Sequence, residues 1–189
     1  MIADIGTGDG RSVLDRASRD PTALVIGVDA SAAAMATSSR RATRRGPHNA
    51  LFFAAGAEQL VGTPLAAHAD LVTVTFPWGS LLRGVLGLDP AALAGVATLA
   101  CPGGRLRVLA SVVPSDGIAG IDCLDETTEP EIRAAWRAAG LVLTSFRPAT
   151  ADEVEASGST WARRLRTALA GRHTRPVMVL EGRPHVYRH

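Results

Sequence analysis

Short apolar runs alternate along the chain with segments whose apolar residues recur at helical spacing. Continuous runs of this kind predict strands that are buried on both faces of a sheet. We expect seven strands, at residues 1–5, 23–28, 51–54, 70–76, 105–110, 141–146 and 176–181. We expect helices at residues 11–19, 32–45, 90–100 and 129–139, and a further one that begins at Ser159. The alternation predicts an α/β fold in which helices cover both faces of a parallel sheet.

Two stretches interrupt this alternation. Pro102-Gly103-Gly104 predicts a turn just before the fifth strand. Residues 111–128 are rich in serine, glycine, aspartate and threonine, so we expect an excursion at the surface after that strand.

The chain has 189 residues, of which 47% are hydrophobic and 20% charged, so we expect one globular domain over residues 1–189. No apolar run reaches the roughly 18–20 residues of a membrane-spanning helix, and we see no leader before the first strand. Cys101 and Cys123 show no metal or redox spacing, which indicates a reducing compartment and no metal site. We therefore expect a cytoplasmic monomer without membrane contacts.

The charged residues narrow the chemistry. All 20 basic residues are arginine, which excludes reactions that need a lysine, such as Schiff-base formation. The net charge of +2 is unevenly spread, because residues 116–155 carry −6 and residues 156–189 carry +6. A basic segment after an acidic one predicts a surface that binds a polyanion.

A glycine-rich loop, Asp4-Ile5-Gly6-Thr7-Gly8-Asp9-Gly10, follows the first predicted strand. Glycines at this place let a ligand approach the backbone closely, although the spacing differs from the dinucleotide fingerprint. Asp29 ends the second strand, where an acidic side chain binds ribose hydroxyls, and Gly56-Ala57-Glu58 follows the third, where an adenine could lie. Together they predict a nucleotide-like cofactor. The alternative is a plain turn, with Asp29 as a helix cap.

Only 4% of the residues are aromatic, so each tryptophan needs an explanation. Trp78 lies in FPWGSLLRGVLG after the fourth strand, at the sheet edge where ligands bind. Trp161 lies in SGSTWARRL, in the first turn of the predicted basic helix. Two such rings can stack a nucleic-acid base that is flipped out of its stack. The alternative for Trp78 is packing in the protein core. Trp136, in RAAWRAAGL, is predicted to pack in the core.

The segments DIGTGDG, VDAS and AGAEQL resemble the class I S-adenosylmethionine-dependent methyltransferases. The resemblance implies a Rossmann-like, seven-stranded, mostly parallel sheet whose last strand is antiparallel. It also implies the cofactor contacts. Asp4, Gly6 and Gly8 would face the methionine end, Asp29 the ribose, and Ala57 and Glu58 the adenine.

FPWGSLLRGVLG and STWARRL together resemble a narrower family, the aminoglycoside-resistance methyltransferases (kanamycin-apramycin type) that act on N1 of adenine 1408 of 16S rRNA in the 30S subunit. By this resemblance Trp78 and Trp161 would stack the adenine, and Ser159 would position the second tryptophan loop. Thr75 and Ser80 match positions near the cofactor and target. The family's N-terminal β-hairpin has no counterpart here, through either a misplaced start site or a real truncation.

Arginines cluster around both tryptophan motifs. Beside stacking rings they are predicted to contact RNA phosphates, the alternative being a solvated basic face. The candidates are Arg83, Arg163, Arg164, Arg166, Arg172 and Arg175. Adenine N1 has its own lone pair, so the reaction needs no general base, metal or nucleophilic side chain. The other functions considered are a small-molecule methyltransferase and a protein that binds cofactor or rRNA with little activity.

Overall fold

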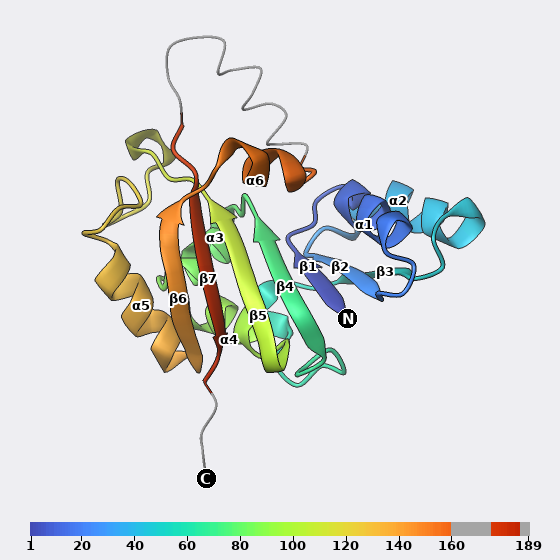
Figure 1. Cartoon of the computed structure of the whole chain (residues 1–189), viewed down its shortest axis with the longest axis horizontal. Helices are drawn as coiled ribbons and strands as arrows, with labels where there is room; N and C mark the ends of the chain where they lie inside the picture. The colour runs from blue at the N-terminus through green and yellow to red at the C-terminus, as the bar shows by residue number, and fades with distance from the viewer. Residues whose placement is uncertain (160–174, 186–189) are drawn as a thin grey trace.

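The computed structural model describes residues 1–159 and 175–185 and is built around one seven-stranded sheet (Figure 1). The strand order is β3-β2-β1-β4-β5-β7-β6. The strands are β1 (Ile2–Ile5), β2 (Val25–Asp29), β3 (Ala50–Ala54), β4 (Ala69–Thr75), β5 (Ala100–Ala110), β6 (Leu141–Pro148) and β7 (Met178–Pro184). β1 to β5 pair in parallel, whereas β7 is antiparallel to both of its neighbours. The predicted mostly parallel sheet with an antiparallel last strand is confirmed.

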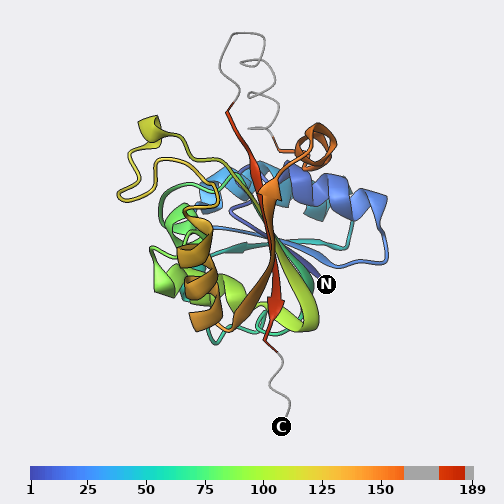
Figure 2. The same ribbon diagram turned by 60° about the vertical axis from the view of Figure 1, so that its left-hand side comes forward.

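Helices lie on both faces of the sheet, as predicted, but they cover it unevenly. The helices are α1 (Arg11–Arg19), α2 (Ala32–Arg45), α3 (Gly79–Val85), α4 (Pro90–Ala97), α5 (Glu129–Ala138) and α6 (Ala151–Ala156), with the short 3-10 turns η1 (Ala57–Gln59) and η2 (Pro114–Asp116). Figures 1 and 2 show α1 and α2 beside β1 to β3, and α3, α4 and α5 behind β4 to β7. The opposite face of β4 to β7 carries only α6 among the described helices, so the described part of the chain leaves it largely open.

The starts of α2 and α4 follow from local capping. Ser31 precedes α2, and its hydroxyl accepts a hydrogen bond from the Ala34 amide at 3.2 Å, as predicted. Asp89 caps α4 in the same way, accepting from Ala92 N at 3.1 Å, and Pro90 occupies the first turn, where its missing N–H is no loss. α4 lies behind the sheet, where Leu93 joins a buried cluster with Ile5 and Val28.

Trp136 lies in the core, as predicted. Its side chain is 0% exposed, and its indole N–H donates to the Val85 carbonyl at 2.8 Å. Gly182 on β7 faces the ring, since a Cβ there would lie 2.7 Å from Trp136 Cζ3. The absence of a side chain at Gly182 therefore lets the indole pack directly on the sheet.

Several predicted boundaries are wrong. The expected turn at 102–104 lies inside β5, where the pairing with β4 shifts register between Ala69 and Leu71. The irregular excursion expected at 111–128 is confirmed, and three residues that are at most 5% exposed anchor it in the core: Val112, Ile121 and Leu124. α3 and α6 were not predicted, because α3 contains two glycines and α6 lacks an apolar face. The helix expected beyond Ser159 lies outside the described residues.

No single helix in the described part of the chain is long and apolar enough to cross a membrane. α3 and α4 reach that length and composition only as a pair, bent by 76° at their junction. Both contribute to the core, through Leu82 and Val85 in α3 and through Leu93 and Val96 in α4.

Replacing Trp136 by phenylalanine is expected to lower the free energy of unfolding by about 1–3 kcal/mol. The change leaves the Val85 carbonyl without its buried donor and opens a small cavity beside Gly182. Denaturant titration followed by far-UV circular dichroism measures the loss. Arg137→Gln, at the exposed neighbouring position, is the control and should stay within about 0.5 kcal/mol of the wild type.

Candidate functional site

The loop between β1 and α1 is shaped by glycines in the left-handed conformation. Gly6, Gly8 and Gly10 have φ values of 73°, 61° and 72°, which side chains with a Cβ adopt only with strain. A Cβ on Gly8 would meet no atom within 4 Å, so the loop leaves open space beside its backbone. The glycine loop predicted as a ligand cradle therefore has the backbone geometry of one.

Asp4, at the end of β1, holds this loop in place. Its Oδ2 atom accepts hydrogen bonds from the hydroxyls of Thr7 and Ser12, each at 2.8 Å. Its Oδ1 atom accepts from the Thr73 hydroxyl on β4, also at 2.8 Å. One carboxylate thus joins β1, the loop, α1 and β4, and it is half-buried at the centre of the site.

Asp29, at the end of β2, is the second acidic anchor. Its Oδ2 accepts from the Gly8 amide at 2.8 Å, and its Oδ1 accepts from the Ser31 amide at 2.8 Å. The carboxylate therefore fixes the glycine loop and the start of α2 together. The alternative role of Asp29, a cap of the following helix, is partly correct, but the same carboxylate also accepts a hydrogen bond from the loop.

Trp78 is set at the end of β4 by an unusual backbone. Phe76, just after the strand, has φ of 50°, and Pro77 separates it from the tryptophan. Gly79, which follows the tryptophan directly, has φ of 58°. A non-glycine residue in this region costs free energy, and such residues cluster at functional sites. Trp78 is 54% exposed, so it is not a core tryptophan like Trp136.

Arg175, just before β7, lies against Trp78. Its guanidinium carbon is 5.9 Å from the centroid of the tryptophan ring, within the range of a cation–π contact. The same guanidinium pairs with Asp116 and donates to Ser111, from Nε to Oγ at 3.0 Å. Its side chain is only 19% exposed. The predicted phosphate contact of Arg175 stays a prediction, and the structure adds a second role beside the tryptophan.

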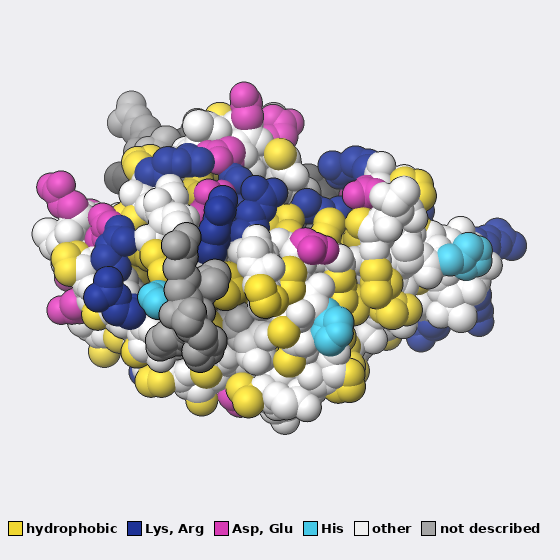
Figure 3. Space-filling view, turned by 60° about the horizontal axis from the view of Figure 1, so that its bottom comes forward, with side chains coloured by type: hydrophobic (Ala, Val, Ile, Leu, Met, Phe, Trp, Pro, Cys, Tyr) yellow, Lys and Arg dark blue, Asp and Glu magenta, His cyan; other side chains and the backbone are white. Residues whose placement is uncertain are grey.

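These elements enclose a cavity of about 270 Å³ at the carboxyl edge of the sheet. It is lined by Asp4, Gly6, Thr7, Gly8, Asp9, Ser12, Thr75, Phe76, Trp78, Ser157, Gly158 and Ser159. A second hollow of about 650 Å³ adjoins it on the open face of the sheet. Figure 3 looks toward the opposite end of β4 and β5, and basic side chains gather beside apolar ones there as well.

Six of the predicted site residues therefore meet in one place: Asp4, Gly6, Gly8, Thr75, Trp78 and Ser159. Asp29 is connected to them through the Gly8 amide. Ala57, Glu58 and Ser80 do not line the cavity, Ala57 being buried and the other two exposed, and Arg83 is exposed on α3. The remaining predicted residues lie outside the described residues: Trp161, Arg163, Arg164, Arg166 and Arg172.

Several lining residues were not predicted as site residues. Thr7, Asp9 and Ser12 flank the predicted glycines. Polar side chains beside a glycine loop are a sequence signal that could have identified them. Ser157 and Gly158 come from the far end of the chain, and only the fold brings them here. Phe76 belongs to the first tryptophan motif, but nothing in the sequence indicates that its φ angle is positive.

Asp116→Asn is expected to lower the free energy of unfolding by about 1–3 kcal/mol. The Asp116 side chain is 8% exposed, and its loss of charge leaves the Arg175 guanidinium without its ionic partner. Urea titration measures the change. Asp122→Asn, an exposed position in the same connection, is the control. Equal stability of the two variants would contradict the structural importance of the pair.

The chain is similar to known proteins both in sequence and in structure. Residues 1–181 match the family model "NpmA: 16S rRNA (adenine(1408)-N(1))-methyltransferase". A 16S rRNA (adenine(1408)-N(1))-methyltransferase of Streptoalloteichus hindustanus is 34% identical over 178 residues, which are 89% of this chain and 81% of that protein.

Solved structures agree with the sequence matches. The 16S rRNA methyltransferase KamB superposes with a TM-score of 0.84 at 30% identity, covering 98% of this chain and 87% of KamB. A mutant of the Catenulisporales acidiphilia 16S rRNA (adenine(1408)-N(1))-methyltransferase, solved with cosubstrate SAM, superposes with a TM-score of 0.85 at 28% identity, covering 100% of this chain and 87% of that one. The predicted class I methyltransferase fold is confirmed. The chain belongs to the family of 16S rRNA (adenine(1408)-N(1))-methyltransferases.

Proposed function

We propose that this protein transfers a methyl group from S-adenosylmethionine to N1 of adenine 1408 of 16S rRNA in the 30S subunit. The observation that carries the proposal is the exposed ring of Trp78 on the wall of the glycine-loop cavity. A flat base stacked on that ring would lie beside the cofactor. The family match supports the choice of target. Methylation there would give aminoglycoside resistance, and a ribosomal substrate would place the protein in the cytoplasm.

The residues around the cavity fit S-adenosylmethionine. The Gly8 backbone borders open space, and its amide is held by Asp29, whose carboxylate is at the strand end where ribose hydroxyls bind. Asp4, Gly6 and Gly8 would hold the methionine end, Asp29 the ribose, and η1, with Ala57 and Glu58, the adenine. When bound, the cofactor supplies an electrophilic methyl group.

The protein's part in the reaction is to position the base. Adenine N1 attacks with its own lone pair, so no side chain has to remove a proton, and orientation lowers most of the barrier. Arg175 lies over one face of the Trp78 ring, and we expect the adenine on the other. The methylated base is cationic, and a cation over an indole face is stabilised by about 0.5–2 kcal/mol. Trp161 would complete the stack from the second motif.

RNA binding would draw on exposed arginines on several elements. Seven lie on the neighbouring helices α1 and α2: Arg11, Arg16, Arg19, Arg40, Arg41, Arg44 and Arg45. Arg83 on α3 is exposed close to the Trp78 segment along the chain. Such side chains contact the phosphate backbone and determine how the protein docks on folded RNA, while the flipped base specifies the site.

The decisive experiment incubates the protein with 30S subunits and methyl-labelled S-adenosylmethionine, then maps the modification by reverse transcription. We expect label in 16S rRNA and a stop at adenine 1408. Subunits carrying guanine at 1408 are the matched control and should remain unlabelled. A folded, cofactor-binding sample that gives no stop would overturn the proposal. Transfer to small molecules without 30S subunits would support the small-molecule alternative instead.

A further inference from the structure

α6 connects β6 to the wall of the cofactor cavity, although none of its six residues is buried. In Figure 1 it lies above the carboxyl ends of β4 and β5. Ser157, Gly158 and Ser159 follow it directly and line the cavity. Because no α6 side chain is fully buried, polar contacts have a large part in fixing where this wall stands.

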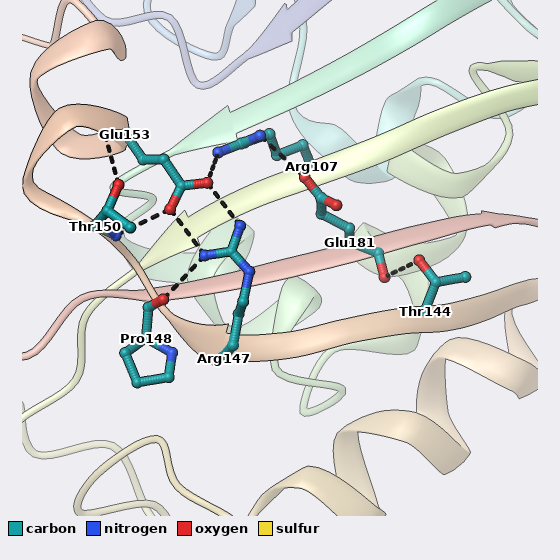
Figure 4. Close-up of polar contacts among 7 residues, drawn as sticks. All are labelled: Arg107, Thr144, Arg147, Pro148, Thr150, Glu153 and Glu181. Atoms are coloured by element: carbon teal, nitrogen blue, oxygen red, sulfur yellow. Dashed lines mark hydrogen bonds and ion pairs between the residues drawn. The ribbon is translucent and has the colours of Figure 1, made fainter.

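Glu153 makes those contacts, as Figure 4 shows. Its carboxylate accepts hydrogen bonds from Arg147 Nη2 at 2.7 Å and Nη1 at 2.8 Å, and from Arg107 Nη2 at 2.6 Å. It also accepts from the Thr150 amide at 2.9 Å, while the Thr150 hydroxyl accepts from the Glu153 amide at 3.2 Å. The Glu153 side chain is thus the point where α6 is attached to the sheet.

The two arginines extend this attachment over three strands. Arg107 lies on β5 and pairs on its other side with Glu181 on β7, at 3.0 Å. Arg147 lies on β6 and also donates to the Pro148 carbonyl at 3.0 Å. The glutamate side chain is 20% exposed. The hydrogen bonds from Arg147, and then that from the Thr150 amide, lower the pKa of Glu153 far below its ordinary value, so the carboxylate is charged at neutral pH.

The segment after Glu153 connects α6 to the cavity wall through a series of hydrogen bonds. The Ser157 amide donates to the Glu153 carbonyl at 3.2 Å, and the Gly158 amide to the Glu155 carbonyl at 3.2 Å. The Ser159 amide donates to Ser157 Oγ at 3.3 Å. The chain is therefore hydrogen-bonded continuously from α6 to the last described cavity residue.

We propose that Glu153 is a positioning residue for methyl transfer: its ion pairs with Arg107 and Arg147 hold α6 so that Ser157–Ser159 form one wall of the cofactor cavity. Trp161 comes two residues after Ser159 in the sequence. The same anchor therefore positions the residue from which the chain continues to the second tryptophan motif. The inference rests on the proposed function for its consequence in catalysis, but its structural part can be tested separately.

The test variant is Glu153→Gln. Glutamine at this position still suits the capping box with Thr150, so the variant removes the ion pairs and keeps the helix cap. Arg147→Gln removes one of these pairs from the strand side, through a side chain that is 43% exposed, and leaves the Arg107 pair in place. Asp152→Asn is the matched control, because it neutralises the adjacent, exposed carboxylate of α6.

Hydrogen exchange, calorimetry with S-adenosylmethionine and 30S kinetics are compared for all variants. In Glu153→Gln and Arg147→Gln we expect about tenfold faster exchange at residues 157–159, about tenfold weaker cofactor binding and about tenfold lower kcat. The double variant should lose less than the sum of the two single variants, because both remove the Arg147–Glu153 pair. Asp152→Asn should behave as wild type.

Exchange and cofactor affinity at wild-type values in Glu153→Gln would overturn the inference, as would an equal effect of Asp152→Asn. If the wild type fails to methylate 30S subunits, the proposed function fails, and exchange and cofactor affinity still decide the role of the anchor. Unchanged exchange in the core strands shows that the variants are folded.

Discussion

Trp78→Ala is expected to reduce methylation of adenine 1408 by about 100-fold or more. Stacking on an aromatic ring contributes about 1–3 kcal/mol per base, and its loss also leaves the base misoriented toward the methyl group. Cofactor affinity should change less than about threefold, since Asp4, Asp29 and the glycine loop remain intact. Single-turnover methylation of 30S subunits, beside calorimetry with S-adenosylmethionine, separates the two effects.

Trp78→Phe provides the matched control, because phenylalanine keeps a ring to stack on. It should retain more activity than the alanine variant. A Trp78→Ala protein that methylates at the wild-type rate would refute the stacking role. Trp161→Ala is expected to show the same pattern on the strength of the second tryptophan motif.

Asp29→Asn is expected to weaken S-adenosylmethionine binding by about 30-fold, with a parallel loss of methylation at limiting cofactor. Both Asp29 oxygens accept backbone N–H groups, from Gly8 and from Ser31. An amide has only one acceptor oxygen, so its NH2 group would face one of these donors, and a lost charge-assisted hydrogen bond costs about 1.5–3 kcal/mol. The glycine loop then loses its anchor, and the ribose loses a charged partner.

Calorimetric titration with S-adenosylmethionine measures this effect directly. Asp15→Asn, an exposed carboxylate on α1, is the control and should bind as the wild type does. Saturating cofactor should restore much of the activity of Asp29→Asn, because Trp78 is untouched. Wild-type affinity in that variant would contradict the ribose assignment.

The glycine-loop side of the cavity was predictable from the sequence. Asp4 and Asp29 lie at the ends of β1 and β2, and Gly6 and Gly8 follow β1. These strands run in parallel, so the places of the four residues at the carboxyl edge follow from the strand pattern. The proline and glycine around Trp78 likewise indicated a strand end rather than a core position. Trp136 was assigned to the core from its helical setting, and its burial confirms this.

The contacts between distant segments were not predictable. The Arg175–Asp116 pair joins residues 59 positions apart, and neither belongs to a recognisable motif. α6 was not predicted, because it lacks the apolar spacing that is the main sequence signal for a helix. Ion pairs hold this helix instead. The turn expected at Pro102-Gly103-Gly104 was wrong because the chain takes up these residues as an irregularity within one continuous strand.

The place of β7 in the sheet bears on how the protein is made. β7 is the last strand of the described chain, yet it lies between β5 and β6. During translation these two strands emerge first, and each presents an unpaired edge that favours association with other chains. The Arg175 contact with Trp78, just ahead of β7, forms in the same late step. The nascent chain therefore depends on completing this final strand, and a message truncated before it would yield an aggregation-prone product rather than a partly active one.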